Sequence, residues 1–209
     1  MEKRIIPSII AESQEVLEKR INRVKNYVSW IHLDVMDGHF VSGHSLDFPF
    51  TLPPTYCRYE AHLMIQNPET WITNNLRKVS TFIVHYESCK NIPRVIQFLK
   101  ENQKRIGIAV NPETPLASIQ KYLNEIDQIV IMTVHPGAYG SRFLPKTLEK
   151  VENLRKLKPS LDIEVDGGIT PLTIKQAADA GVNLFVSGSY ILEAQDVKDA
   201  ILNLRMKFF

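Results

Sequence analysis

The sequence is poor in cysteine and has no long hydrophobic run. Cys57 and Cys89 are its two cysteines, and neither belongs to a Cys pair of the metal-binding type. Two cysteines are too few for a disulfide framework, so we expect reduced thiols in or near the core. No apolar stretch approaches the length of a membrane span, and residues 1–7 lack the apolar segment of a secretory signal. We therefore expect a cytoplasmic protein without a membrane partner.

An excess of charge of either sign is also absent. The chain has 25 Lys and Arg against 23 Asp and Glu, a formal net charge of +2, and no long run of one sign. A surface of this kind offers no electrostatic footprint to a polyanion. The sequence therefore predicts that the partner is neither a nucleic acid nor an anionic membrane.

Short runs rich in Ile, Val and Phe recur along the chain and alternate with longer segments of helical period. This alternation is typical of repeated βα units around a parallel sheet. Hydrophobic residues make up 44% of the chain, enough to bury one sizeable core, so we expect a single domain over residues 1–209. The predicted strands lie at residues 4–8, 30–35, 58–63, 81–85, 105–110, 128–133, 162–165 and 184–187.

Helix signals lie between several of these strands. Three pairs combine a capping side chain with a proline suited to the first helical turn: Asn67-Pro68, Thr114-Pro115 and Thr170-Pro171. Gly181 marks a helix end. Residues 45–56 differ, because three prolines leave little room for a helix there. We expect a shortened or irregular connection between the second and third strands.

Eight strands with seven credible helices predict an α/β fold of the (β/α)8 or TIM-barrel type, with an open doubly wound sheet as the competitor. The barrel is favoured by polar side chains at the carboxyl ends of many strands, the face where barrels build active sites. These residues are Ser8, His32, Asp34, His62, His85, Asn111 and Asp166. In an open sheet we would expect them at one switch point.

Two strands carry ionisable residues on one face. In IHLDVMDG, His32 and Asp34 share a face because side chains alternate along a strand, and in IEVDGG Glu164 and Asp166 do the same. Such a face turned into a barrel needs compensation for its charge. A divalent metal provides it, and His with Asp, joined by ligands from neighbouring strands, makes a mixed nitrogen and oxygen site.

These runs belong to a set of motifs that resembles the ribulose-phosphate 3-epimerase family over nearly the whole chain. The motifs are PSI (7–9), HLDVMDG (32–38), HLM (62–64), HYE (85–87), NPETPL (111–116), MTVHPG (132–137), VDGGI (165–169) and GS (188–189). Together they are specific, although a single His-x-Asp is weak. The resemblance implies the barrel, a phosphorylated ketose substrate and assembly into homodimers or hexamers.

The resemblance also implies one divalent ion, namely zinc, iron(II), manganese or cobalt, bound by His32, Asp34, His62 and Asp166. It further implies that Asp34 and Asp166 are the catalytic proton-transfer pair. Inverting a carbon beside a ketone removes a proton from one face and returns one to the other through a planar enediolate. The reaction therefore needs a base and an acid on opposite sides of the substrate.

Other positions match the family's substrate site. Met36, Met64 and Met132 would form a soft apolar wall that keeps water from the reacting centre. The substrate phosphate is expected in the loops after the last two strands, where glycines let backbone amides approach an anion. The substrate-binding residues implied by the resemblance are Ser8, Met36, His62, Met64, Met132, Gly137, Gly140, Gly167, Gly168, Gly188 and Ser189.

Several polar residues near these motifs receive other interpretations. We expect Glu164 to orient a metal-bound histidine or to pair with a cation. His85 and Glu87 are expected to line the inner wall or a subunit contact. Arg142 is interpreted as a solvated surface residue, with a phosphate contact as the alternative. The remaining histidines are expected in exposed loops: His39, His44 and His135.

The loop after the sixth strand departs from the family. Where relatives have Pro-Gly-Phe-Gly-Gly-Gln, residues 136–141 read PGAYGS, so that Tyr139 replaces a glycine. If this loop covers the substrate, its path and closing motion differ here. Three functions remain open: a 3-epimerase that interconverts ribulose 5-phosphate and xylulose 5-phosphate, a 3-epimerase of a ketohexose 6-phosphate such as allulose 6-phosphate, and sugar-phosphate binding without turnover.

Overall fold

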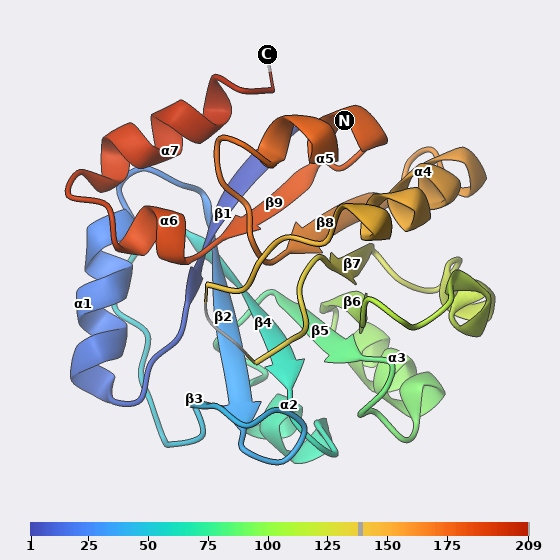
Figure 1. The fold of residues 1–209 in the computed structure, drawn as a ribbon. Helices are drawn as coiled ribbons and strands as arrows, with labels where there is room; N and C mark the ends of the chain where they lie inside the picture. The colour runs from blue at the N-terminus through green and yellow to red at the C-terminus, as the bar shows by residue number, and fades with distance from the viewer. Residues whose placement is uncertain (138–139, 209) are drawn as a thin grey trace.

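The chain forms a closed barrel of parallel strands surrounded by helices (Figure 1). This computed structural model describes residues 1–137 and 140–208. The barrel strands are β1 (Arg4–Ile9), β2 (Trp30–Asp37), β4 (Arg58–Met64), β5 (Thr81–His85), β6 (Arg105–Val110), β7 (Gln128–Met132), β8 (Asp162–Asp166) and β9 (Leu184–Ser187). Because β1 pairs with both β2 and β9, the ring is closed and the predicted TIM-barrel fold is confirmed.

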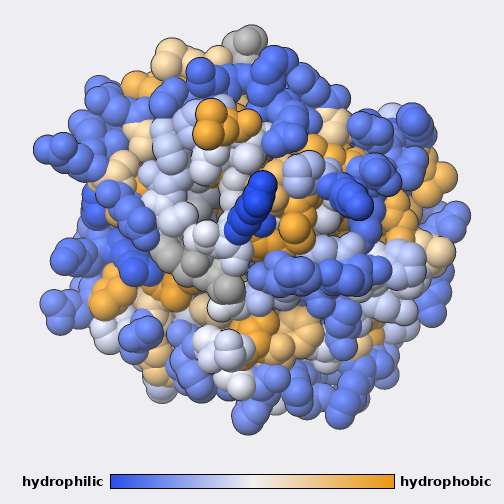
Figure 2. Space-filling view, viewed as in Figure 1, coloured by the Kyte–Doolittle hydropathy of each residue, from blue (hydrophilic) through white to orange (hydrophobic). Residues whose placement is uncertain are grey.

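Helices cover the outside of the barrel. They are α1 (Gln14–Val24), α2 (Glu69–Asn75), α3 (Ile92–Glu101), α4 (Leu148–Leu157), α5 (Ile174–Ala180), α6 (Ser189–Leu192) and α7 (Val197–Arg205), with the 3-10 helices η1 (Leu116–Ser118), η2 (Gln120–Tyr122) and η3 (Pro145–Thr147). Within the described ranges, no helix combines the length and apolar character needed to cross a bilayer. Hydrophilic residues predominate at the periphery of the view in Figure 2, and hydrophobic patches lie nearer its centre.

Alternation of side chains along the strands divides the buried residues into two kinds of core. On β2, Ile31, Leu33 and Val35 point outward into the large hydrophobic cluster between strands and helices. Smaller clusters fill the barrel interior: Ile83, Ala109, Val130, Met132 and Val134 in one, and Ile6, Trp30, Leu184 and Val186 in another. The outward faces hold the helices, which leaves the inward faces available for polar side chains.

The connection from β2 to β4 is irregular, as predicted. It contains the short strand β3 (His44–Ser45), antiparallel to β2, and no helix across residues 46–57, all of which are described. Ser45 Oγ accepts a hydrogen bond from the Ala11 backbone nitrogen at 2.9 Å, and the Leu46 nitrogen donates to the Ala11 carbonyl at 3.0 Å. These bonds fix the connection to the chain that follows β1.

The proline signals located helical regions better than helix starts. Helix α5 begins later than its Thr-Pro pair predicts, and α2 follows its Asn-Pro pair without a side-chain cap. After Thr114 the chain forms η1 and η2 instead of an α-helix, and the Thr114 hydroxyl donates to Glu87 rather than to a helix terminus. Gly181 ends α5 in the left-handed conformation, with a φ of 109°, as expected.

Both cysteines are free and buried, as expected. The Cys57 thiol donates to the backbone carbonyls of Lys25 and Val28, at 3.2 and 3.1 Å. Burial raises the pKa of the Cys89 thiol to about 11. Since the thiolate is the reactive form, this cysteine is chemically inert near neutral pH.

Gly107 of β6 occupies a tight point inside the barrel. A Cβ at this position would lie 2.8 Å from Ile83 Cγ1 and 3.0 Å from Gln128 Cγ. Because close-packed interiors tolerate added methyl groups poorly, we expect Gly107→Ala to lower the free energy of unfolding by about 1–3 kcal/mol. Urea denaturation would show a lower midpoint at an unchanged m-value. A midpoint equal to that of the wild type would contradict the expected strain.

Candidate active site

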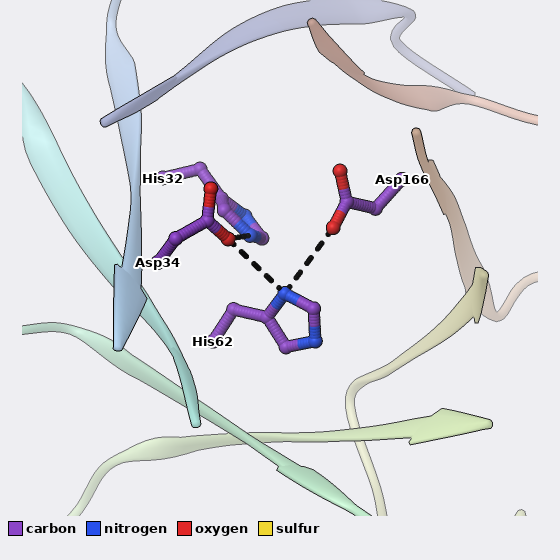
Figure 3. A group of neighbouring side chains, drawn as sticks. All are labelled: His32, Asp34, His62 and Asp166. Atoms are coloured by element: carbon purple, nitrogen blue, oxygen red, sulfur yellow. Dashed lines mark ion pairs between the residues drawn. The ribbon is translucent and has the colours of Figure 1, made fainter. Parts of the chain in front are cut away.

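Four ionisable side chains from three strands meet at the carboxyl end of the barrel (Figure 3). His32 and Asp34 project from β2, His62 from β4 and Asp166 from β8, and the register of the sheet sets Asp34 opposite His62. His62 Nδ1 lies 3.3 Å from Asp34 Oδ1 and 3.2 Å from Asp166 Oδ2. His32 Nε2 also lies 3.3 Å from Asp34 Oδ1. The predicted ligand candidates therefore come together, with one atom of each within 4.8 Å of the others.

The atoms that face one another in this cluster are buried and lack hydrogen bonds. Among the described residues, His32 Nε2, Asp34 Oδ1 and His62 Nδ1 are enclosed polar atoms without a hydrogen-bond partner. Such atoms cost free energy unless a ligand satisfies them. Two imidazole nitrogens and two carboxylate oxygens form a donor set that divalent transition metals accept. The residues present therefore fit a divalent ion.

Charges of both signs balance within the cluster. Burial alone would raise the pKa of Asp34, but His32 and His62 hold it well below its usual range. Burial alone would lower the pKa of His62, but Asp166 and Asp34 raise it above its ordinary value. The contacts with the two imidazoles thus favour the anionic form of Asp34, which is also the effect of a bound cation.

A second buried polar layer orients His32. His32 Nδ1 lies 2.7 Å from Glu60 Oε1 and 3.5 Å from Glu164 Oε1. Gln128 Nε2 bridges the two carboxylates, at 3.3 Å from Glu60 and 3.4 Å from Glu164. Glu164 faces inward as predicted, but the nearer carboxylate is Glu60, which was not among the predicted site residues. The sequence could have indicated Glu60 only through its spacing, because Glu60 precedes His62 by two residues and therefore lies on the same face of the strand.

Behind His62, the imidazole of His85 continues the polar contacts. The Nε2 atoms of His62 and His85 lie 2.8 Å apart, and His85 Nδ1 lies 3.2 Å from Glu87 Oε2. His85 is fully buried on the inner face of β5, in agreement with the expected inner-wall position. The sequence motifs did not indicate its contact with His62, because that contact depends on the register of β4 and β5, which sets His62 across from Ile83, two residues before His85.

A cavity of about 460 Å³ opens over the cluster. The side chains of Asp34 and Asp166 reach it with 7% and 13% of their area exposed, whereas the side chains of both histidines are fully buried. The predicted substrate residues that line the cavity are Ser8, Met36, Met64, Met132, Gly137, Gly140, Gly167, Gly168, Gly188 and Ser189. His62, predicted in the same set, contacts both acids but is not among the described lining residues. A molecule in the cavity therefore meets the carboxylates first.

The cavity wall beside the acids is apolar. Met36 and Met64 form a buried cluster with Val41, and Met132 belongs to a cluster inside the barrel. Thioethers pack flexibly into irregular spaces and present an apolar surface to the cavity. The position of the three methionines agrees with the predicted apolar wall.

On the side of β8, the backbone itself borders the cavity. Gly167 and Gly168 adopt left-handed conformations with φ of 108° and 67°. A Cβ on Gly167 would lie 2.2 Å from Val134 Cγ2, and one on Gly168 would lie 2.9 Å from the Phe143 backbone nitrogen. Glycine is therefore required here for both conformation and space, and it leaves the backbone accessible to a ligand.

The loop after β7 contributes to the rim. Arg142 is exposed, as interpreted, and it also lines both this cavity and a neighbouring one. The predicted effect of Tyr139 on the loop falls outside the described residues. His39, His44 and His135 are exposed as predicted, although His44 lies in β3 and contacts Asp47 at 2.7 Å.

Comparison with known proteins shows the family to which the chain belongs. The chain matches the family described as "Ribulose-phosphate 3 epimerase family" over residues 4–192. It belongs to this family. Among curated members, it is 37% identical to ribulose-phosphate 3-epimerase of Schizosaccharomyces pombe (97% of this chain, 92% of that protein) and 34% identical to that of Bacillus subtilis (97% and 98%). The cytoplasmic isoform from Oryza sativa subsp. japonica is 36% identical (97% and 92%).

Solved structures of lower similarity agree on the fold alone. The chain superposes on 3-hexulose-6-phosphate synthase with a TM-score of 0.72 at 17% identity, covering 99% of this chain and 100% of that one. For KGPDC from Streptococcus mutans, the TM-score is 0.71 at 16% identity, with 100% and 98% covered. At such identities, chemistry does not transfer with the fold.

The donor set predicts that divalent metal stabilises the folded chain. After chelator treatment, adding Zn²⁺ or Mn²⁺ at about 100 times its dissociation constant should contribute about 2.7 kcal/mol, seen as a rise in Tm. Asp34→Asn removes a ligand charge and should abolish most of the rise. Asp47→Asn, at an exposed carboxylate, is the matched control and should retain it. An equal rise in all three proteins would locate the binding elsewhere.

Proposed function

We propose that the chain is a metal-dependent 3-epimerase that interconverts ribulose 5-phosphate and xylulose 5-phosphate. One observation carries the proposal: Asp34 from β2 and Asp166 from β8 open on the same cavity while both contact His62. Their strands are separated by β1 and β9, so the two carboxylates approach the cavity from different sides. Family membership supports the reaction, since the curated relatives are named ribulose-phosphate 3-epimerase.

Two carboxylates on different sides suit an inversion at carbon. The substrate's C3 proton is acidified by the neighbouring ketone, and one aspartate removes it from one face of the molecule. The other aspartate, protonated beforehand, returns a proton to the opposite face of the planar enediolate. The two acids end the turnover with their protonation states exchanged, so Asp34 and Asp166 serve either direction of the reaction.

The metal site supports the same chemistry. A divalent ion held by His32, Asp34, His62 and Asp166 would supply Lewis-acid stabilisation of the negative charge that develops on the substrate's oxygens. Zinc, iron(II), manganese and cobalt all suit this donor set. The methionine wall keeps water from the carboxylates, which strengthens their electrostatic effect and protects the enediolate from stray protons.

For the substrate phosphate, we propose the loops after β8 and β9. Backbone amides near Gly167, Gly168 and Gly188 can approach an anion because no Cβ intervenes. Arg142 is the one basic side chain among the described lining residues, and it adjoins Phe143, whose backbone lies against Gly168. A dianionic phosphate between these groups directs the sugar's ketone toward the acids.

Domain organisation, assembly and compartment are further parts of the proposal. We propose that residues 1–209 act as one barrel domain and that copies assemble as a homodimer or hexamer, in keeping with the family resemblance. The cytoplasm is the proposed compartment, supported by the rice relative that is named a cytoplasmic isoform. The curated relatives named above do not favour a ketohexose phosphate, and binding without turnover would not require an acid on each side of the cavity.

The proposal is tested by turnover in heavy water. With metal present, ribulose 5-phosphate should be converted to xylulose 5-phosphate with deuterium incorporated at C3, and allulose 6-phosphate should react more slowly. Asp34→Asn and Asp166→Asn should each lower kcat by about 10²–10⁴-fold, because each loses one of the two proton transfers. Absence of both turnover and C3 deuterium in the metal-loaded wild type would overturn the assignment, whereas faster turnover of the hexose would change the substrate.

The phosphate contact of Arg142 is tested separately. Because charge-assisted hydrogen bonds are the stronger kind, Arg142→Gln should raise KM for ribulose 5-phosphate about tenfold with little change in kcat. The matched control is Lys146→Gln, which removes an exposed cation that lines the neighbouring cavity and should leave KM unchanged. Equal effects of the two substitutions would point to general electrostatic attraction instead of a contact.

A further inference from the structure

A chain of hydrogen bonds leads from His62 away from the cavity to a carboxylate near the protein surface. His62 Nε2 lies 2.8 Å from His85 Nε2, and His85 Nδ1 lies 3.2 Å from Glu87 Oε2. The other oxygen, Glu87 Oε1, accepts hydrogen bonds from the Asn111 backbone nitrogen at 2.8 Å and from the Thr114 hydroxyl. His85 and Glu87 are therefore each hydrogen-bonded through two different atoms, to one group nearer the cavity and to another nearer the surface.

The outer end of this chain determines where the protons lie. A backbone N–H can only donate, so Glu87 Oε1 is an acceptor. Burial opposes the charge of Glu87, but its contacts with His85 and Thr114 hold its pKa down to about 2. As a carboxylate, Glu87 has acceptors on both oxygens, and His85 must present an N–H to it from Nδ1.

Protonation at Nδ1 determines the other nitrogen of His85. His85 is fully buried and its Nδ1 donates to Glu87, and a neutral imidazole has a single N–H. Its Nε2 is then an acceptor for His62 Nε2–H. His62 in turn is left with a bare Nδ1, the nitrogen that faces Asp34 and Asp166.

We propose that Glu87 and His85 are positioning residues that place the proton of His62 on Nε2 and so reserve its Nδ1 lone pair for the metal. The inference deepens the proposed function and rests on its metal centre. His32 would bind the metal through Nε2 instead of Nδ1, because its Nδ1 contacts Glu60 and its Nε2 faces Asp34. Two histidines that bind through different nitrogens need two separate carboxylates to set them.

Ring packing keeps His62 and His85 in the geometry that these hydrogen bonds require. The His62 and His85 rings are stacked, with centroids 4.9 Å apart and planes inclined by 21°. Phe40 covers His85, with centroids 4.8 Å apart. Both histidines are fully buried, so water cannot replace a missing partner without a rearrangement.

The decisive substitution is Glu87→Gln, which keeps the size of the side chain. An amide has one acceptor oxygen, so it cannot serve Asn111 and His85 at once. An amide NH2 turned toward His85 would donate to its Nδ1. The proton of His85 would then lie on Nε2, and the proton of His62 on Nδ1. We expect the affinity for Zn²⁺, measured by competition with a chelator, to fall about 10–100-fold.

The matched control is Glu113→Gln. Glu113 lies 3.5 Å from His135 in an exposed pair, which reproduces the residue types without contact to the cluster. The affinity of the Glu113→Gln variant for Zn²⁺ should equal that of the wild type. Wild-type affinity in Glu87→Gln, or an equal loss in both variants, would overturn the proposal.

A second measurement needs no substitution. Nitrogen-15 NMR of the zinc-loaded wild type distinguishes a protonated from a bare imidazole nitrogen, and should find His85 protonated at Nδ1 and His62 at Nε2. A His85 proton on Nε2 would refute the proposal even if Glu87→Gln failed to fold. Zinc binding and proton positions are measured without substrate, so this result stands apart from turnover. A wild type that bound no zinc would overturn the positioning role of Glu87 and His85. Zinc binding with the expected proton positions but without epimerisation would overturn only the proposed epimerase activity.

Discussion

The structure depends on keeping opposite charges in contact inside a barrel that excludes water. Two imidazoles and two carboxylates converge within 4.8 Å, and three of the facing atoms have no hydrogen bond among the described residues. An unbalanced charge at this depth would be costly. Glu60 beside His32 and His85 beside His62 extend that balance outward, so the polar interior is a connected network rather than isolated pairs.

The cluster divides its members by depth. The histidines are fully buried, whereas the carboxylates of Asp34 and Asp166 reach the cavity. In the proposed reaction, the groups that exchange protons with the sugar are those that reach the cavity, and the groups that only hold the metal are enclosed. The methionines and the glycines that follow β8 border the cavity in different ways, because the methionines present apolar side chains while the glycines leave the backbone accessible.

Much of this arrangement could be predicted because strand alternation is a local property. His32 and Asp34 alternate with apolar neighbours, and that pattern was enough to place them inside the barrel. Contacts that depend on the register between strands or on the paths of loops were harder to predict. The only sequence signal for Glu60 was its two-residue spacing from His62. Thr114 belongs to a helix-start pattern, but its hydroxyl donates to Glu87 in the turn after β5. Tertiary partners of that kind override local preference.

The register between β2 and β4 constrains how the family's chains can vary in length. Asp34 stands directly across from His62, and the residues on either side of Asp34 support the helices. Inserting one residue into β2 would exchange these two faces, which would remove both the proposed ligands and the outer core. We therefore expect changes of length to be tolerated better in irregular segments such as residues 46–57 than within β2.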